Sequence, residues 1–171
     1  NFTQIGGQLR SNLAAVDLNL GLATPWTSNC NGQVSALSLA GNRLYVGGLF
    51  SSLAGQPRLN LGAVDANTGL AHAWASDADA QVFALDASTP TVYVGGNFLT
   101  LGGQLRSFIG AVDSSTATVT AWAPEASASV RTIVPVCDRI YVGGAFTSIG
   151  GQIRSRVAAL DLISGLASPW D

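Results

Sequence analysis

Short stretches with alternating or continuous apolar residues recur along the whole chain. Residues 34–38 are small or β-branched, and residues 82–85 and 130–134 repeat them. Stretches of this length and composition predict β-strands, and no helical periodicity appears. Longer apolar runs predict strands that are buried on both faces, and they fall at residues 13–16, 59–64, 108–112 and 157–160. The pattern therefore predicts an all-β fold.

A repeat of 48 residues orders these strands. YVGGAFTSIGGQIR at residues 141–154 has full copies at residues 93–106 and 45–58 and a shortened copy at residues 2–10. A period in this range combined with strand-like content is typical of β-propellers. We therefore expect a β-propeller built of four-stranded antiparallel blades.

The repeat divides a single domain into about three and a half blades. Residues 33–80 and 81–128 are expected to form whole blades, and residues 129–171 a blade complete through its fourth strand. Residues 1–32 contain only the third and fourth strands of a blade. We expect that the ring does not close on itself, and that sequence outside this chain or another chain completes it. Open sheet faces and edges favour association.

Two features of the repeat predict local geometry. A glycine pair such as Gly47-Gly48 ends the second strand, where it marks a bulge or a close backbone approach. The third strand leads into a turn in which Asp accepts backbone hydrogen bonds and Gly takes positive φ. One of these turns has Ala117 in place of Gly, and we expect it to be the least comfortable of the four. The turns begin at Asp17, Asp65, Asp113 and Asp161.

The combination of YVGGxF, GGQxR, AxDxxTG and a Trp at this spacing resembles the bacterial delta-sixty repeat β-propellers. The resemblance covers essentially the whole chain, and kelch-type blades are more distantly similar. The resemblance implies a propeller fold and a secreted or cell-surface setting, and it carries no catalytic motif. The tyrosine that kelch blades have before the turn is absent, because Ala63-Val64 and Ala15-Val16 stand there.

Composition narrows the possible partners. Charged residues make up 11% of the chain, all eight basic residues are Arg, and the net charge is −2. The usual charged share is roughly 25%, so the chain offers no electrostatic attraction for nucleic acid or an anionic membrane. Low Lys with abundant Ala, Ser, Thr and Gly favours an extracellular protein.

Polar residues of the repeat are the candidate ligand-binding positions. Gln and Arg of GGQxR are expected to lie on one rim, with the Asp turns on the opposite rim. Either they are structural, with Arg pairing with rim carboxylates and Gln satisfying loop backbone, or they bind a polar or anionic ligand such as a glycan. The positions are Gln8, Arg10, Gln56, Arg58, Gln104, Arg106, Gln152 and Arg154.

Aromatic residues of the repeat are interpreted as packing residues between blades rather than as a sugar platform. These are Trp26, Trp74, Trp122 and Trp170. Asp77 and Asp79 supply too few oxygens for calcium, and His72, the only His, has no nucleophile near it in sequence. We therefore expect neither an enzyme nor a metal or other cofactor.

The two cysteines are predicted not to form a disulfide with each other. Cys30 falls on the fourth-strand loop, whereas Cys137 falls in the turn after the first strand, on the opposite rim and more than two blades away. Disulfide partners need Cα atoms within about 7 Å. A bond to another chain or to a segment outside this one stays open.

These features predict a non-catalytic extracellular module that presents blade rims and edges to partner chains or to copies of itself. The alternative is a carbohydrate-binding or adhesion module that uses the Gln/Arg rim. A third, weaker hypothesis is a piece of a propeller enzyme whose chemistry lies outside these residues.

Overall fold

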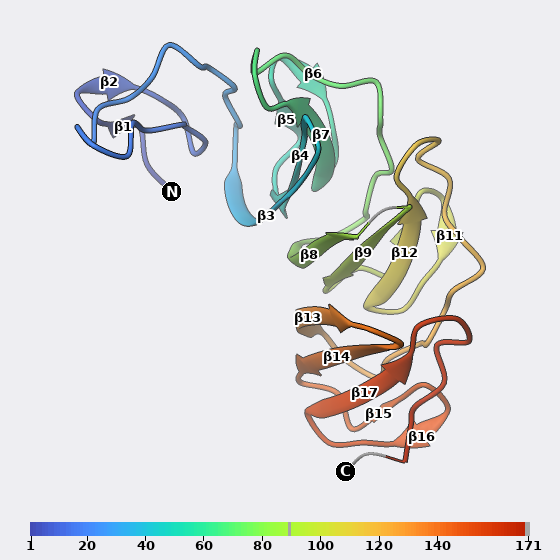
Figure 1. Cartoon of the computed structure of the whole chain (residues 1–171). Coiled ribbons are helices and arrows are strands. Elements are labelled where there is room, and N and C mark those ends of the chain that lie inside the picture. The colour runs from blue at the N-terminus through green and yellow to red at the C-terminus, as the bar shows by residue number, and fades with distance from the viewer. Residues whose placement is uncertain (89, 170–171) are drawn as a thin grey trace.

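The computed structural model describes residues 1–88 and 90–169, which form an open arc of small antiparallel sheets (Figure 1). Trp170 lies outside the described residues. Within these ranges there is no helix, and hence no helix suited to crossing a membrane. The all-β prediction is confirmed.

Three sheets of three strands make up most of the arc. The first two predicted strands of each unit form a hairpin, and the third predicted strand pairs with the second. Strands β3, β8 and β13 line the concave side (Figure 1). The sheets contain β3 (Gln33–Ala40), β4 (Arg43–Leu49) and β7 (Leu61–Asp65); β8 (Val82–Ser88), β9 (Thr91–Gly96) and β12 (Ile109–Asp113); β13 (Val130–Val136), β14 (Arg139–Gly144) and β17 (Val157–Asp161).

The expected fourth strand is reduced to one bridge in each unit. Val64 pairs with Ala71, and Val112 and Leu160 make the equivalent bridges with Val119 and Ala167. Beyond this bridge a side chain holds the outer segment: Arg58 Nη2 donates to the carbonyl oxygen of His72 at 3.0 Å. The described sheets are therefore three-stranded, with a bridged outer segment.

Four short hairpins occupy the loops that carry the GGQxR motif, and the sequence analysis missed them. Each joins two strands of two residues across the glycine-containing turn. They lie toward the outer circumference of the arc (Figure 1). The hairpins are β1 (Gln4–Ile5) with β2 (Gln8–Leu9), β5 (Ser52–Leu53) with β6 (Gln56–Pro57), β10 (Thr100–Leu101) with β11 (Gln104–Leu105), and β15 (Ser148–Ile149) with β16 (Gln152–Ile153).

The N-terminal unit, residues 1–32, differs from the others. Residues 13–16 do not form the predicted strand, and only Val16 makes a bridge, to Ala23. In the other units this segment pairs with a second strand, as β7 pairs with β4. Among the described residues no such strand lies beside residues 13–16, so the ladder does not form.

The hydrophobic core lies between consecutive units. One cluster joins Tyr93 and Trp122 of residues 81–128 to Val130 and Phe146 of the following unit. Equivalent clusters join the earlier units. Sheets that pack face to face bury their apolar side chains in this way. Each sheet therefore depends on its neighbour for its core.

The glycine pair allows this close packing. A Cβ atom on Gly47 would lie 2.5 Å from Cγ1 of Val82 in the next unit, and one on Gly48 would lie 1.9 Å from the carbonyl oxygen of Gln33. The pairing register also shifts between Val34 and Ala36, opposite the glycines. The bulge and the close approach expected from the sequence are therefore both present.

Left-handed backbone recurs at a fixed repeat position that the sequence analysis did not single out. Asn12, Asn60, Phe108 and Arg156 have φ between 62° and 70°. Asn60 suits this conformation and also holds two loops, because Oδ1 accepts from Phe50 N–H at 3.1 Å and Nδ2 donates to the Ala78 carbonyl at 2.9 Å. Phe108 and Arg156 adopt the same φ without these side-chain bonds.

Replacing Ala117 with Gly should stabilise the protein. Ala117 has a φ of 63°, whereas Gly21, Gly69 and Gly165 fill the same position in the other turns. A non-glycine residue in this region costs about 1–2 kcal/mol, and the entropy of glycine offsets about half of that. Urea unfolding should show a gain of about 0.5–1 kcal/mol for Ala117→Gly. Gly165→Ala should lower stability, and an unchanged or lower midpoint for Ala117→Gly would contradict the prediction.

Arg156→Asn should stabilise the last unit by about 1 kcal/mol, because Asn tolerates left-handed backbone and its Oδ1 can accept from Phe146 N–H, as Asn60 Oδ1 accepts from Phe50 N–H. Arg156 is exposed, so little packing is lost. Chemical denaturation measures the effect, and Asn60→Arg is the reciprocal variant, which should be destabilised. If both variants lower stability, left-handed strain is not the controlling factor at this position.

Candidate functional site

The Gln and Arg residues of GGQxR separate into exposed amides and occupied guanidinium groups. Gln8, Gln56, Gln104 and Gln152 are exposed on the outer hairpins. Each Arg is only partly exposed and donates to two backbone carbonyls. Arg106 is representative: Nη1 donates to Leu105 at 2.6 Å and Nη2 to Thr120 at 2.5 Å. Arg10, Arg58 and Arg154 make the same pair of bonds.

This geometry corrects one detail of the structural interpretation. The expected partners of these Arg residues were rim carboxylates, but the observed acceptors are carbonyl oxygens. The nearby carboxylates hold loop backbone instead: Asp77 accepts from Leu59 N–H, and Asp79 accepts from the N–H groups of Leu99 and Thr100. The guanidinium groups therefore fix each hairpin to the outer segment of its own unit. Gln56 and Arg58 also border a shallow pocket of about 390 Å³.

Trp26, Trp74 and Trp122 connect neighbouring units. The indole N–H of Trp74 donates to the carbonyl of Asp113 in the next unit at 2.9 Å, and Trp26 and Trp122 reach Asp65 and Asp161 at 3.3 Å. Trp74 and Trp122 also meet Tyr45 and Tyr93 edge to face. These three residues are packing residues.

The turn aspartates organise the backbone that follows them. Oδ1 of Asp113 accepts from the N–H groups of Ser115 and Thr116 and from both of their hydroxyl groups. These bonds, the Ser115 hydroxyl foremost, hold the pKa of Asp113 far below its usual range. Asp65 and Asp161 each accept one such hydroxyl bond, from Thr68 and Ser164, so the Ser115 bond is additional and helps to hold the turn that lacks Gly. Asp17, Asp65 and Asp161 accept the same pair of backbone bonds.

Both cysteines are free, as predicted for this pair. Cys30 is buried, and its backbone forms an isolated antiparallel β-bridge with Leu53. Burial raises the pKa of its thiol. Cys137 is exposed in the β13–β14 turn. Within the described ranges, no group of three or more His, Cys, Asp or Glu side chains is arranged to hold a metal ion.

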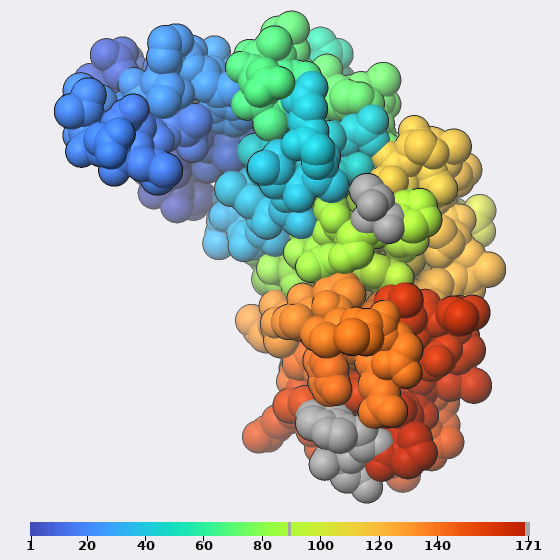
Figure 2. Space-filling view, in the orientation of Figure 1, coloured from blue at the N-terminus to red at the C-terminus, as the bar shows by residue number. Residues whose placement is uncertain are grey.

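Strand β3 presents an uncovered apolar face on the concave side of the arc. Figure 2 shows the open arc in space-filling form. Leu37 and Leu39 on β3 are 50% and 60% exposed, whereas Ile133, the counterpart of Leu37 on β13, is 7% exposed. Ile133 is covered because it packs on Gly95 of the preceding unit. The described residues include no such glycine strand in front of Leu37.

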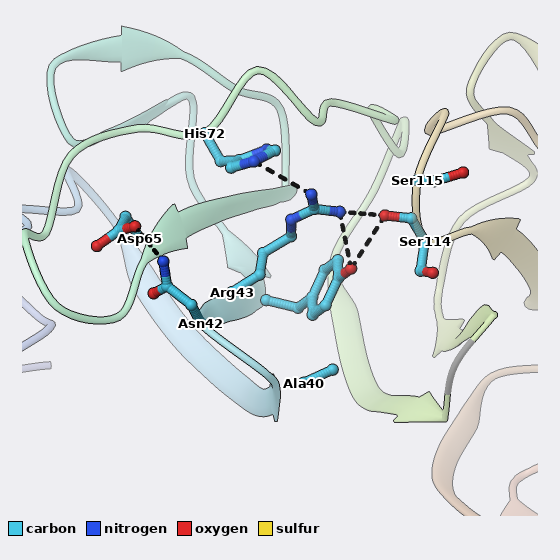
Figure 3. Close-up of a pocket in the computed structure, with 8 residues that line it drawn as sticks. Ala40, Asn42, Arg43, Asp65, His72, Ser114 and Ser115 are labelled. Atoms are coloured by element: carbon cyan, nitrogen blue, oxygen red, sulfur yellow. Dashed lines mark hydrogen bonds between the residues drawn. The ribbon is translucent and has the colours of Figure 1, made fainter.

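A second feature that the sequence analysis missed is a cleft between the first two sheets (Figure 3). It has a volume of about 350 Å³, and Arg43, Tyr45, His72 and Ser114 are among the residues that line it. The available signal was the combination of Arg43 with His72, because the unit that repeats Arg at position 139 has Ser168 in place of His, and the unit between them has Thr91 and Thr120.

One family model matches a short part of the chain. A family model described as a domain of unknown function (DUF5122) beta-propeller matches residues 138–161, which contain all of β14 and β17. A search of curated proteins gives no match. The all-β sheets and the family match support a β-propeller family.

Two designed proteins are among the similar solved structures. The computationally designed Ika4 protein is 12% identical, with 77% of this chain and 92% of that chain covered and a TM-score of 0.41. The computationally designed Ika8 protein is 11% identical, with 96% and 73% covered and a TM-score of 0.44.

Acid should destabilise the protein through the turn aspartates. Hydrogen bonds, chiefly from Ser115, Thr68 and Ser164, lower the pKa values of Asp113, Asp65 and Asp161. A carboxylate with a lowered folded-state pKa stabilises the fold above its unfolded pKa of about 3.9, and this contribution is lost as pH falls through the folded value. The urea concentration at the unfolding midpoint should therefore fall as the pH is lowered from 5 to 3, because protonation of these carboxylates removes their stabilising hydrogen bonds.

Asp113→Asn should make this acid dependence shallower, and Glu125→Gln, an exposed side chain outside the turns, is the matched control. The prediction fails if the midpoint is constant down to pH 3, or if Asp113→Asn retains the full dependence.

Proposed function

We propose that this chain is a non-catalytic, extracellular interaction module in which the exposed face of β3 binds a β-hairpin, supplied by a partner chain or by sequence outside these residues. The observation that carries the proposal is the half-exposed Leu37, whose counterparts on β8 and β13 pack on a glycine strand of the preceding unit. The β-propeller-like fold suggests an interaction module, and the identity of the partner and the extracellular setting are parts of the proposal.

Contacts between the units indicate what the partner must provide. Val82 and Leu85 fill the space above Gly47, and Val130 and Ile133 fill the space above Gly95. Val34 and Leu37 are the equivalent side chains of β3. A strand that ends in a glycine pair would accept them, whereas larger side chains would keep the backbones apart.

Residues 13–16 offer the same partner a strand edge. They align with β7, which pairs with β4 in its own unit, and they have no strand beside them among the described residues. An extended segment can add to such an edge through main-chain hydrogen bonds, with side-chain pockets supplying specificity. The edge and the leucine face together form one docking surface.

The non-catalytic part of the proposal is supported by the environment of His72. Its Nδ1 accepts from Trp74 N–H at 3.0 Å, so the neutral ring carries its proton on Nε2 and lacks a free acceptor nitrogen for base catalysis. The extracellular part is supported by composition alone. Glycan binding by the Gln/Arg motif has weaker support, because its guanidinium groups are bound to backbone carbonyls.

A peptide with the sequence of residues 81–98, which carries β8, β9 and Gly95-Gly96, tests the docking surface. We expect saturable binding to the intact chain and slower amide hydrogen exchange at residues 13–16. The peptide with Gly95→Leu should not bind, because its side chain would meet Val34 and Leu37. Leu37→Glu in the chain should also abolish binding, with circular dichroism used to verify that the variant folds.

Light scattering over a concentration series tests for a second copy as the occupant. Self-association that Leu37→Glu abolishes would support the same docking surface, with a copy of this chain as its partner. A chain that remains monomeric, neither binds the peptide nor gains exchange protection, contradicts the proposal. Equal binding of the Gly95→Leu peptide would contradict the glycine-strand mechanism.

A further inference from the structure

Arg43 and His72 form a polar pair in the cleft between the first two sheets (Figure 3). Arg43 Nη2 lies 3.1 Å from His72 Nε2, and Nη1 donates to Tyr45 Oη at 3.2 Å and to the Ser114 carbonyl oxygen. Nε of Arg43 is buried without a hydrogen-bond partner, as it also is in Arg10, Arg58 and Arg106, so it does not distinguish this group. The guanidinium group is thus fixed at the boundary between two units.

This pair departs from the repeat. Thr91 and Arg139 align with Arg43, and Thr24, Thr120 and Ser168 align with His72, so only one unit combines an Arg with a His. The equivalent cleft between the next two sheets has a volume of about 370 Å³ and is lined by residues such as Thr91, Pro135 and Cys137. The repeated architecture therefore does not require a cationic group at this place.

The neighbouring units also determine the tautomer of His72. Thr24 Oγ1 and Thr120 Oγ1 each accept from the N–H of the tryptophan two residues later, at 3.3 Å. Nδ1 of His72 takes over this role and accepts from Trp74 N–H at 3.0 Å. A neutral imidazole with an accepting Nδ1 carries its hydrogen on Nε2.

The N–H donors of His72 and Arg43 therefore point toward each other inside the cleft. The N–H at Nε2 and the N–H at Nη2 lie 3.1 Å apart, and neither can accept from the other. Burial, followed by the charge of Arg43, lowers the pKa of His72, so the neutral ring is favoured. An acceptor that bridges both N–H groups would resolve this contact.

We propose that the cleft binds a small organic monocarboxylate, whose oxygens accept from Arg43 Nη2 and His72 Nε2. Charge-assisted bonds from Arg to a carboxylate are among the stronger hydrogen bonds in proteins. Asp65 also lines the cleft, and its Oδ2 is held by Asn42 Nδ2 at 2.6 Å. This fixed negative charge disfavours a dianion such as phosphate relative to a monoanion.

The only His of the chain provides a direct spectroscopic probe. Acetate, glucuronate, glucose and inorganic phosphate are titrated at neutral pH while the imidazole nitrogen signals of the intact chain are followed. Saturable shifts with acetate and glucuronate, and none with glucose, are expected. Tighter binding of glucuronate than of acetate assigns the site to sugar acids, and equal affinities assign it to the carboxylate alone.

The repeat itself supplies the variants. Arg43→Thr introduces the residue found at position 91 and should weaken carboxylate binding about tenfold or more, the loss expected for one charge-assisted hydrogen bond. His72→Thr introduces the residue of position 120 and should weaken binding measured by calorimetry. Arg139→Thr, at the aligned position without a His, is the matched control and should bind normally.

Three results would overturn the proposal. The first is the absence of a saturable shift at carboxylate concentrations up to about 50 mM, roughly the weakest affinity that the Arg43–His72 pair would explain. The others are equal carboxylate binding by the Arg43→Thr variant and phosphate binding as tight as acetate binding. Because Leu37 lies outside this cleft, the Leu37→Glu variant should retain carboxylate binding. The two proposals can therefore fail independently.

Discussion

Packing of the first strand of one unit on the glycine strand of the preceding unit is the contact on which the structure depends. A three-stranded sheet of this size has no core of its own, and its apolar side chains are buried only when the next sheet lies against it. Gly47 and Gly95 set the separation, because a Cβ atom there would collide with Val82 or Val130. The indole bonds of Trp74 and Trp122 then fix each pair of units.

The same dependence explains why an uncovered sheet face is the strongest candidate for interaction. Leu37 is an ordinary core residue of the repeat, yet it is half exposed because no glycine strand lies in front of it among the described residues. Such a surface selects its partner by size, because only a strand with small side chains can pack against it. Function would then use the contact that already holds the units together.

Repeated and unrepeated polar residues have different roles. Arg106 and Asp113 recur in every unit, and both are occupied by groups of their own unit. Arg43 and His72 occur together once, and their geometry leaves two N–H donors without an acceptor between them. In a repeat protein, departures from the repeat are therefore the more informative places to search for a ligand site.

Local chemistry was predictable from the sequence, whereas contacts between segments were not. The strands, the Asp turns and the bulge at Gly47 follow from side-chain alternation and backbone preferences, which act over a few residues. The hairpins of the GGQxR loops, the single bridge at Ala71 and the carbonyl partners of Arg58 depend on how segments apart in the sequence meet in the fold. The pairing of Arg43 with His72 also required the fold, because residues 29 positions apart meet only when the sheet and its outer segment bring them together.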